Sequence, residues 1–152
     1  MTIGPILTFL LFLGLTVAAA AFGAMFQPGA WYQALVKPAW TPPNWLFGPV
    51  WTVLYVMIAI AGWLVWREQG LSFVVVVWVL QLVLNGAWSW IMFGQHQIGL
   101  ALADIFLLWI SIVLFAVLAW PVSLTASLLF VPYLAWVSYA GALNFAIWRL
   151  NG

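Results

Sequence analysis

Five long apolar stretches dominate this sequence and constrain its fold more than any other feature. They lie at roughly residues 3–26, 43–66, 71–93, 98–119 and 122–148, separated where Gly, Pro, Gln, Asn or charged residues gather. A helix that crosses a bilayer needs about 20 apolar residues, so each stretch is long enough for one crossing. The short breaks between the later stretches make successive helices antiparallel neighbours. We therefore predict an all-α integral membrane bundle of five transmembrane helices, forming one domain over the whole chain.

The composition supports a membrane location and excludes several classes of function. Only 3% of the residues are charged and 68% are hydrophobic, which leaves too little polar surface to cover a water-soluble domain of 152 residues. A net charge of +1 gives no basic surface for nucleic acid. Without cysteine there is no disulfide, thiolate nucleophile or Cys-ligated metal site. We predict a multi-pass membrane protein that binds no nucleic acid.

The first apolar stretch has two interpretations. The small residues 18–24 resemble a signal-peptide cleavage site. However, no positive charge precedes the stretch, and its apolar run is longer than a typical signal core. We favour a retained membrane span.

The longest loop, residues 27–41, follows the first span and contains Trp31, Tyr32 and Trp40 with one lysine. This composition suits a segment that lies at the headgroup level or folds over the mouth of the bundle. We predict a lid-like loop between helices 1 and 2.

The residues after this loop predict where the second helix begins and bends. Thr41 is a suitable N-cap, and Pro42 suits the first helical position because its missing N–H costs nothing there. Pro49 would then lie about two turns inside the helix, where proline causes a bend. The bend would give Trp51 and Tyr55 room on the inner side.

The third stretch carries a polar stripe in its middle. Gln81, Asn85 and Ser89 follow one another at a spacing of four residues, with Trp88 alongside. Polar side chains in the hydrocarbon region need partners, either across helices or around a ligand or water. Both interpretations stay open for Asn85.

Two further polar residues have modest expected roles. Asp104 is the one acid expected in the membrane interior, and with no second acid near it in sequence an acid–base pair is not supported. We predict that it makes a structural hydrogen bond. His96, the sole histidine, falls in a short loop, and we favour a solvated residue over a haem ligand. One histidine does not make a metal site, so no metal is predicted.

The fifth stretch repeats the pattern of a proline before a deep tryptophan, with Pro132 before Trp136. The parallel with Pro49 and Trp51 suggests two bent helices that present indole rings to a common cavity. An aromatic cavity with few hydrogen-bonding groups is typical of a site for a flat apolar ligand. A channel or transporter more usually shows a polar-lined path or broken helices.

Three long motifs resemble the translocator protein family, also called tryptophan-rich sensory proteins or peripheral-type benzodiazepine receptors. They are WYQALVKPAWTPPNWLFGPVWTVLY at residues 31–55, QLVLNGAWSWIMFG at 81–94 and VPYLAWVSYAGALNFAIWRLN at 131–151. The resemblance implies a five-helix bundle, often a homodimer. It further implies binding of porphyrins such as protoporphyrin IX and haem, of sterols, and of synthetic isoquinoline or benzodiazepine ligands.

The resemblance also implies which residues form the site. Carried over by position, the ligand-binding residues are Tyr32, Trp51, Tyr55, Asn85, Trp88, Ser89, Trp136, Ala140 and Leu143. Of these, Trp51 and Trp136 match the tryptophans linked in some members to light-dependent porphyrin breakdown, and they would be catalytic if this chain degrades porphyrin. No resident cofactor is expected, because porphyrin or haem would be a ligand.

The sequence departs from the family pattern in two places. Phe145 stands where the C-terminal sterol-recognition pattern has tyrosine, so the phenolic hydroxyl is missing. The bulky run FVVVVW at residues 73–78 resists close helix approach, whereas Gly14, Ala18 and Ala21 offer a small face on the first helix for a dimer.

We favour a membrane receptor or sensor for tetrapyrroles and other flat hydrophobic ligands. The first alternative is a light-dependent porphyrin-degrading enzyme that uses Trp51 and Trp136. The second is a transporter of porphyrin or sterol. A bacterial membrane is favoured over the mitochondrial outer membrane.

Overall fold

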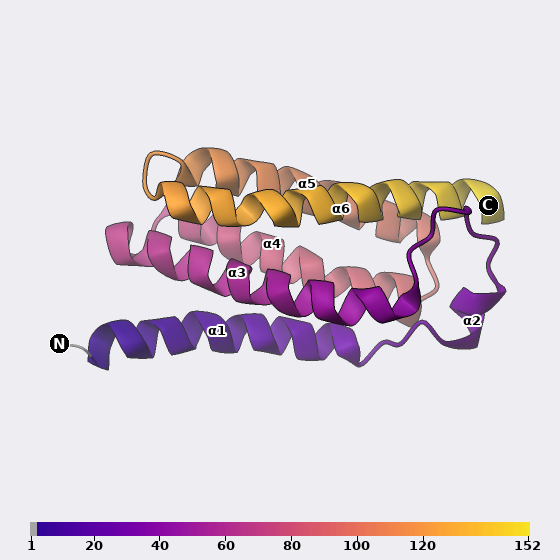
Figure 1. Cartoon of the computed structure of the whole chain (residues 1–152), viewed down its shortest axis with the longest axis horizontal. Helices are drawn as coiled ribbons and strands as arrows, with labels where there is room; N and C mark the ends of the chain where they lie inside the picture. The colour runs from indigo at the N-terminus through magenta and orange to yellow at the C-terminus, as the bar shows by residue number, and fades with distance from the viewer. Residues whose placement is uncertain (1–2) are drawn as a thin grey trace.

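Five long helices run side by side along the molecule in the computed structural model, which describes residues 3–152 (Figure 1). Each of them is long and apolar enough to cross a membrane, and a loop with a short helix joins the first two. The predicted fold class is therefore confirmed. The elements in chain order are α1 (Ile3–Ala24), α2 (Gly29–Ala34), the 3₁₀ turn η1 (Asn44–Leu46), α3 (Phe47–Gln69), α4 (Phe73–Ser89), the π-helical turn η2 (Trp90–Gly94), α5 (Ile98–Ala119) and α6 (Leu124–Asn151).

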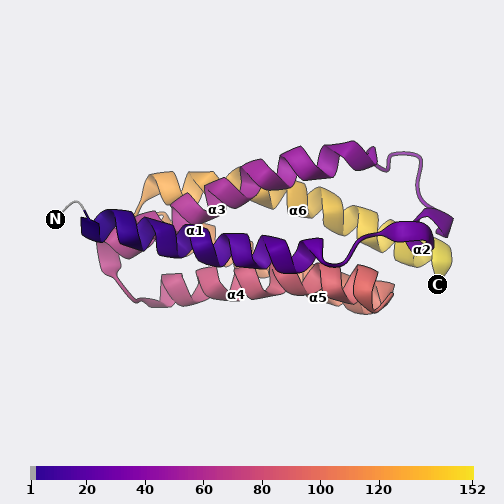
Figure 2. The ribbon, with the colours of Figure 1, turned by 90° about the horizontal axis from the view of Figure 1, so that it is seen from below.

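The long helices close into a ring in the order α1, α3, α6, α5 and α4. α1 packs against α3 and α4, α3 packs against α6, and α5 packs against both α6 and α4. In the view from below, α3 and α6 lie on one side of α1, and α4 and α5 lie on the other side (Figure 2). The consecutive helices α3 and α4 contact each other less extensively than either contacts its other neighbours. Side chains that point inward from different helices therefore meet inside the ring.

The two termini lie at opposite ends of the bundle (Figure 1). α2 and the extended segments around it pass over the end that holds the C-terminus. Five crossings require this arrangement, and it brings the loop and the C-terminal turn of α6 to one end of the bundle.

The second long helix begins later than predicted. Pro43 is the N-cap residue of η1, with an extended backbone at ψ 146°, and α3 starts only at Phe47. A helical start at Pro42 is wrong because a residue that precedes a proline is disfavoured in the helical region, and Pro43 follows it. Pro49 is consequently the third residue of α3, so its predicted place two turns inside the helix is also wrong.

The last helix, α6, runs unbroken past its predicted end at residue 148. The Ser123 Oγ caps its start by accepting a hydrogen bond from the Ala126 N–H at 3.2 Å. At the other end, Asn151 donates through its Nδ2 to the carbonyl of Ile147 at 2.8 Å. Pro132 lies inside the helix, as the sequence predicts.

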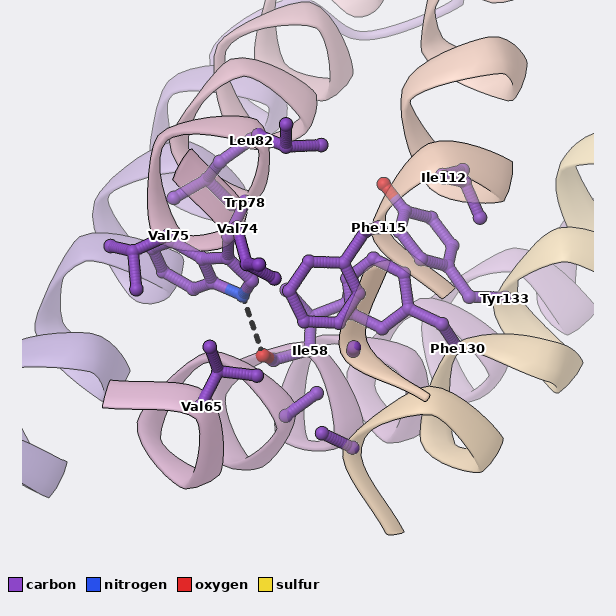
Figure 3. Close-up of a cluster of buried hydrophobic side chains, with 14 of the residues drawn as sticks. Ile58, Val65, Val74, Val75, Trp78, Leu82, Ile112, Phe115, Phe130 and Tyr133 are labelled. Carbon is purple, nitrogen blue, oxygen red and sulfur yellow. Dashed lines mark hydrogen bonds between the residues drawn. The ribbon is translucent and has the colours of Figure 1, made fainter. Parts of the chain in front are cut away.

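The largest side chain in the centre of the ring is Trp78 of α4, which is fully buried. Its indole N–H donates to the carbonyl of Ile58 on α3 at 2.8 Å, drawn as the dashed line in Figure 3. Phe115 of α5 and Phe130 of α6 pack with their ring centroids 4.1 Å apart, and Phe130 continues to Tyr133 at 5.2 Å. Aromatic contacts thus join the helices around the core.

Candidate ligand-binding site

A buried chain of polar side chains crosses the ring from α3 through α4 to α6. The hydroxyl of Tyr55 donates to Asn85 Oδ1 at 3.0 Å, and Asn85 Nδ2 donates to the hydroxyl of Tyr133 at 2.7 Å. Tyr133 in turn donates to Gln81 Oε1 at 2.8 Å, and Gln81 Nε2 donates to the carbonyl of Trp78 at 2.8 Å. Polar groups without water satisfy one another in this way, so the stripe on α4 holds three helices together.

Trp51 lies against this polar chain at its α3 end. Its ring centroid is 5.4 Å from that of Tyr55 and 6.3 Å from that of Tyr133. Asn85 is only 6% exposed, whereas Trp51 and Tyr55 are half-buried. The α3 end of the chain is therefore more exposed than its middle.

Trp136 of α6 has a buried indole N–H with no hydrogen-bond partner. Its ring packs against Phe47 of α3 at 5.6 Å and against Tyr139 at 5.8 Å. The tryptophans Trp51 and Trp136 thus both lie where α3 and α6 pack together. A buried tryptophan N–H usually finds a partner, so this unpaired donor is an exception among the described residues.

The remaining predicted residues near the loop form a second cluster. Trp88 Nε1 donates to Asn144 Oδ1 at 2.9 Å, and Asn144 Nδ2 donates to the carbonyl of Ile98 at 3.2 Å. Phe93 joins this cluster to the loop, because its ring lies 5.4 Å from Trp88 and 5.6 Å from Tyr32. Leu143 is buried in the same cluster.

Three anchors hold the loop between α1 and α3, here called the lid (residues 27–41), over the end of the bundle. The Val36 N–H donates to Asn151 Oδ1 at 3.0 Å, and Asn151 Nδ2 donates back to the Val36 carbonyl at 2.8 Å. The Tyr139 hydroxyl donates to the carbonyl of Trp40. Trp31 stacks on His96 with ring centroids 4.2 Å apart and planes 6° from parallel. The lid is thus fastened to α6 and to the turn before α5.

Within the lid, Lys37 fixes the position of Tyr32. Its Nζ donates to the carbonyls of Tyr32 at 2.8 Å and Leu35 at 3.2 Å, and it lies 4.7 Å above the Tyr32 ring. The ammonium group therefore caps the C-terminal end of α2, and it donates to backbone carbonyls of the lid itself. Burial raises the pKa of the Tyr32 phenol above its ordinary value.

Two predicted residues remain, Ser89 and Ala140, and Ala140 packs against the same core cluster as Trp51 and Trp136. Ser89 does not join the chain of Gln81 and Asn85, since its Oγ lies 3.3 Å from where a Cβ on Gly23 of α1 would be. Ser89 is the last residue of α4, next to the π-helical turn. Ala140 is half-buried against the main core.

Asp104 is 7% exposed on the inner face of α5, and its Oδ2 accepts no hydrogen bond from the described residues. The structural hydrogen bond predicted for this carboxyl is therefore not made by that oxygen. Among residues 3–152, no three His, Asp or Glu side chains gather closely enough to hold a metal ion.

One concave surface formed by the described residues lies outside this region. A shallow apolar groove of about 350 Å³ runs along the outer side of α5 and α6. Its lining residues are Leu102, Ile105, Phe106, Trp109, Val137, Ser138 and Gly141. Between α3, α4 and α6 the aromatic side chains rest on one another, so a ligand there would have to displace or separate them.

Sequence reasoning missed Tyr133 as part of the site and treated Gln81 only as a polar residue of the stripe. The signal for Tyr133 is its position one helical turn before Trp136, on the same side of α6. The pairing of Asn144 with Trp88 likewise depends on the contact between the ends of α4 and α6, which the sequence does not show.

Five apolar helices closed into a ring, with a buried polar chain and tryptophans at its centre, define a multi-pass α-helical membrane protein. The chain belongs to the TspO/MBR family, whose sequence model matches residues 9–149. This confirms the family to which the three motifs point.

Relatives with similar sequences span bacteria and mammals. The tryptophan-rich protein TspO of Chlorobaculum tepidum is 46% identical over 153 residues, which cover 96% of this chain and 97% of that protein. Protein CrtK of Rhodobacter capsulatus is 43% identical over 140 residues, covering 88% of this chain and 86% of the relative. The human translocator protein is 41% identical over 126 residues, or 80% of this chain and 75% of the human protein.

Proposed function

We propose that this protein is a membrane receptor for tetrapyrroles such as protoporphyrin IX and haem, and for other flat hydrophobic ligands. The ligand would lie between α3 and α6, beside Trp51 and Trp136. The observation that carries the proposal is the buried indole N–H of Trp136, which has no partner in a region otherwise well supplied with hydrogen bonds. A carbonyl or carboxylate of a ligand would satisfy it.

The aromatic surroundings of this donor support a flat ligand. Phe47 and Tyr139 pack against the ring of Trp136, and Trp51 and Tyr55 add two further rings on α3. Planar conjugated molecules gain both apolar burial and favourable ring contacts in such surroundings. Isoquinoline and benzodiazepine ligands have the same flat apolar character and would use the same place.

The lid gives the proposed site a controlled entrance. Tyr139 contacts the ring of Trp136 and also donates to the carbonyl of Trp40 in the lid. A ligand that moves Trp136 would therefore act on a lid anchor through one intervening side chain. This coupling suits a protein that senses a ligand by changing the order of a surface loop.

The test is quenching of tryptophan fluorescence by protoporphyrin IX, measured in the dark with the purified protein in nanodiscs. We expect saturable quenching, weakened in Trp51→Phe and in Trp136→Phe. The matched control is Trp120→Phe, because Trp120 is 59% exposed at the other end of the bundle. Quenching that does not saturate, or that is unchanged in both Trp51→Phe and Trp136→Phe, would contradict the proposal.

Light-dependent porphyrin degradation is the second candidate function, and the position of Trp51 favours it. Trp51 is an oxidisable ring held against two tyrosines, Tyr55 and Tyr133. The same samples under illumination distinguish the two functions. Loss of porphyrin absorbance that requires Trp51 and Trp136 would support an enzyme. Loss at the same rate as in empty nanodiscs would support a receptor that does not degrade its ligand.

A homodimer, which the family resemblance implies, is also proposed. Gly14, Ala18 and Ala21 are exposed on the outer face of α1, and no side chain lies within 4 Å of a Cβ placed on Gly14. Helices approach most closely through such small residues. Gly14→Leu should shift the mass measured in detergent by light scattering toward the monomer, and an unchanged mass would exclude this face.

A further inference from the structure

The polar chain inside the ring ends on a group that can only accept a hydrogen bond. That group is the backbone carbonyl of Trp78, to which Gln81 Nε2 donates at 2.8 Å. A carbonyl has no hydrogen to donate, so the amide of Gln81 must turn its NH₂ group toward Trp78. Its Oε1 is then the atom that faces Tyr133.

This one fixed orientation determines the direction of every later hydrogen bond. The Tyr133 hydroxyl meets an acceptor in Gln81 Oε1 and must donate to it, so the Tyr133 oxygen must accept from Asn85. Asn85 therefore turns its Nδ2 toward Tyr133 and its Oδ1 toward Tyr55. The single hydrogen of the Tyr55 hydroxyl is then committed to Asn85 Oδ1.

The interior members of the chain are buried from solvent. Gln81 and Tyr133 are 0% exposed, and Asn85 is 6% exposed. The carboxyl oxygen Oδ2 of Asp104 makes no hydrogen bond to the chain. Reversing one hydrogen bond would place two buried donors, or two buried acceptors, opposite each other, which is costly in a membrane interior.

We propose that the Tyr55 oxygen faces the ligand site as a hydrogen-bond acceptor, so that the site prefers ligands carrying an N–H or O–H donor beside Trp51. Gln81 and Tyr133 are the positioning residues that set this preference without touching the ligand. The inference rests on the proposed function, because it needs a ligand next to Trp51 and Tyr55. It adds to that function the kind of polar group that the ligand must offer.

The experiment compares two flat probes of nearly the same shape, carbazole and dibenzofuran. Carbazole offers an N–H donor where dibenzofuran has an oxygen acceptor. Binding of each probe to the full-length protein in nanodiscs is measured by equilibrium dialysis against empty nanodiscs of the same lipid, and the readout is the ratio of the two dissociation constants. The wild-type protein should favour carbazole by roughly threefold to tenfold, the range of one net hydrogen bond.

Three variants test the mechanism through the same ratio. Tyr55→Phe removes the acceptor and should bring the ratio to about one. Gln81→Leu removes the acceptor of the Tyr133 hydroxyl, which can then donate to Asn85 Oδ1 instead. The Asn85 amide would turn its NH₂ group toward Tyr55. The Tyr55 hydroxyl would then be free to donate to a ligand, so this variant should favour dibenzofuran. Thr52→Val is the matched control, because it also removes a hydroxyl from α3, but this hydroxyl is exposed, donates to the Gly48 carbonyl and lies outside the chain. It should leave the ratio unchanged even if both affinities shift.

The outcomes separate this inference from the proposed function. Equal binding of both probes by the wild-type protein, or a ratio that is unchanged in Tyr55→Phe, overturns the inference. Saturable porphyrin quenching would still support the receptor proposal in that case. Failure of both probes to bind also overturns it, and if porphyrin quenching fails as well the receptor proposal is lost with it. Should Gln81→Leu not fold, the Tyr55→Phe ratio decides alone, because Tyr55 is half-buried at the end of the chain and phenylalanine keeps its packing.

Discussion

Trp78 of α4 occupies the space that a side chain on Gly62 of α3 would need. A Cβ at Gly62 would lie 2.5 Å from Trp78 Cε2 and 2.6 Å from its Nε1. The missing side chain lets the indole come close enough to α3 to donate to the Ile58 carbonyl, one turn earlier, at 2.8 Å. This close approach joins two helices that otherwise contact each other little.

Gly62→Ala should therefore destabilise the bundle. The added methyl group must displace the indole of Trp78 or the ring of Phe12, whose Cδ1 would be 2.9 Å away. Overpacking of this kind costs about 1–3 kcal/mol. Thermal unfolding in a mild detergent, followed by circular dichroism, should show a lower Tm than the wild type.

The matched control for this prediction is Gly48→Ala, which lies on α3 itself. No side chain lies within 4 Å of a Cβ placed there, and the residue faces outward. Since alanine is the better helix former, the Tm should stay the same or rise slightly. An equal loss of Tm in both variants would mean that the glycines matter for another reason than space.

Removing the Tyr133 hydroxyl should cost more stability than removing the Tyr55 hydroxyl. Tyr133→Phe leaves both Asn85 Nδ2 and Gln81 Oε1 without partners, whereas Tyr55→Phe leaves only Asn85 Oδ1. Each buried unsatisfied group costs about 1–3 kcal/mol. Unfolding in a denaturing detergent should rank wild type, Tyr55→Phe and Tyr133→Phe in falling order; the reverse order for the two variants would contradict the chain described here.

Asn151→Ala should loosen the lid while leaving the helices intact. The change removes both hydrogen bonds to Val36. Amide exchange should then speed up at Val36 and also at Thr41, whose N–H donates within the lid to the Pro38 carbonyl at 3.1 Å. Gln69→Ala, at the opposite end, should change neither rate. Faster exchange at Val36 alone would show only the loss of one local bond.

The lid should also contribute less to stability at alkaline pH. Burial raises the pKa of Tyr32 above its ordinary value of 10.0, so the opened lid ionises at a lower pH than the closed one. The contribution of Tyr32 is then complete below the ordinary pKa and is lost as the pH rises through the raised one. As the pH rises above the ordinary pKa of 10.0, the Tm of the wild type should fall more than that of Tyr32→Phe. Parallel curves for the two proteins would show that Tyr32 takes no part.

The helices of this fold are largely predictable from the sequence, because hydrocarbon length fixes how many apolar residues a span needs. The fourth span, predicted at residues 98–119, is α5 at Ile98–Ala119. The start of α3 differs from the prediction because Pro43 disfavours a helical backbone at Pro42, and this effect outweighs the preference for Thr41 as a cap.

The partners of the polar residues are less predictable. A spacing of four residues puts Gln81, Asn85 and Ser89 on one side of a helix, but the π-helical turn that follows and the neighbouring α1 decide what each one meets. The ring order of the helices depends on long-range packing, which no local pattern encodes. Tyr133 could join Gln81 to Asn85 only once α4 and α6 were known to face each other.

The anchors of the lid also impose an order on how the protein is built. Val36 and Asn151 are separated by 115 positions in the chain, and α6 leaves the ribosome after the other four long helices. The lid therefore has no partner for its two hydrogen bonds to Asn151 until those helices and α6 have been made. Until then the lid is not fastened to α6, and the mouth of the bundle stays open to the headgroup region.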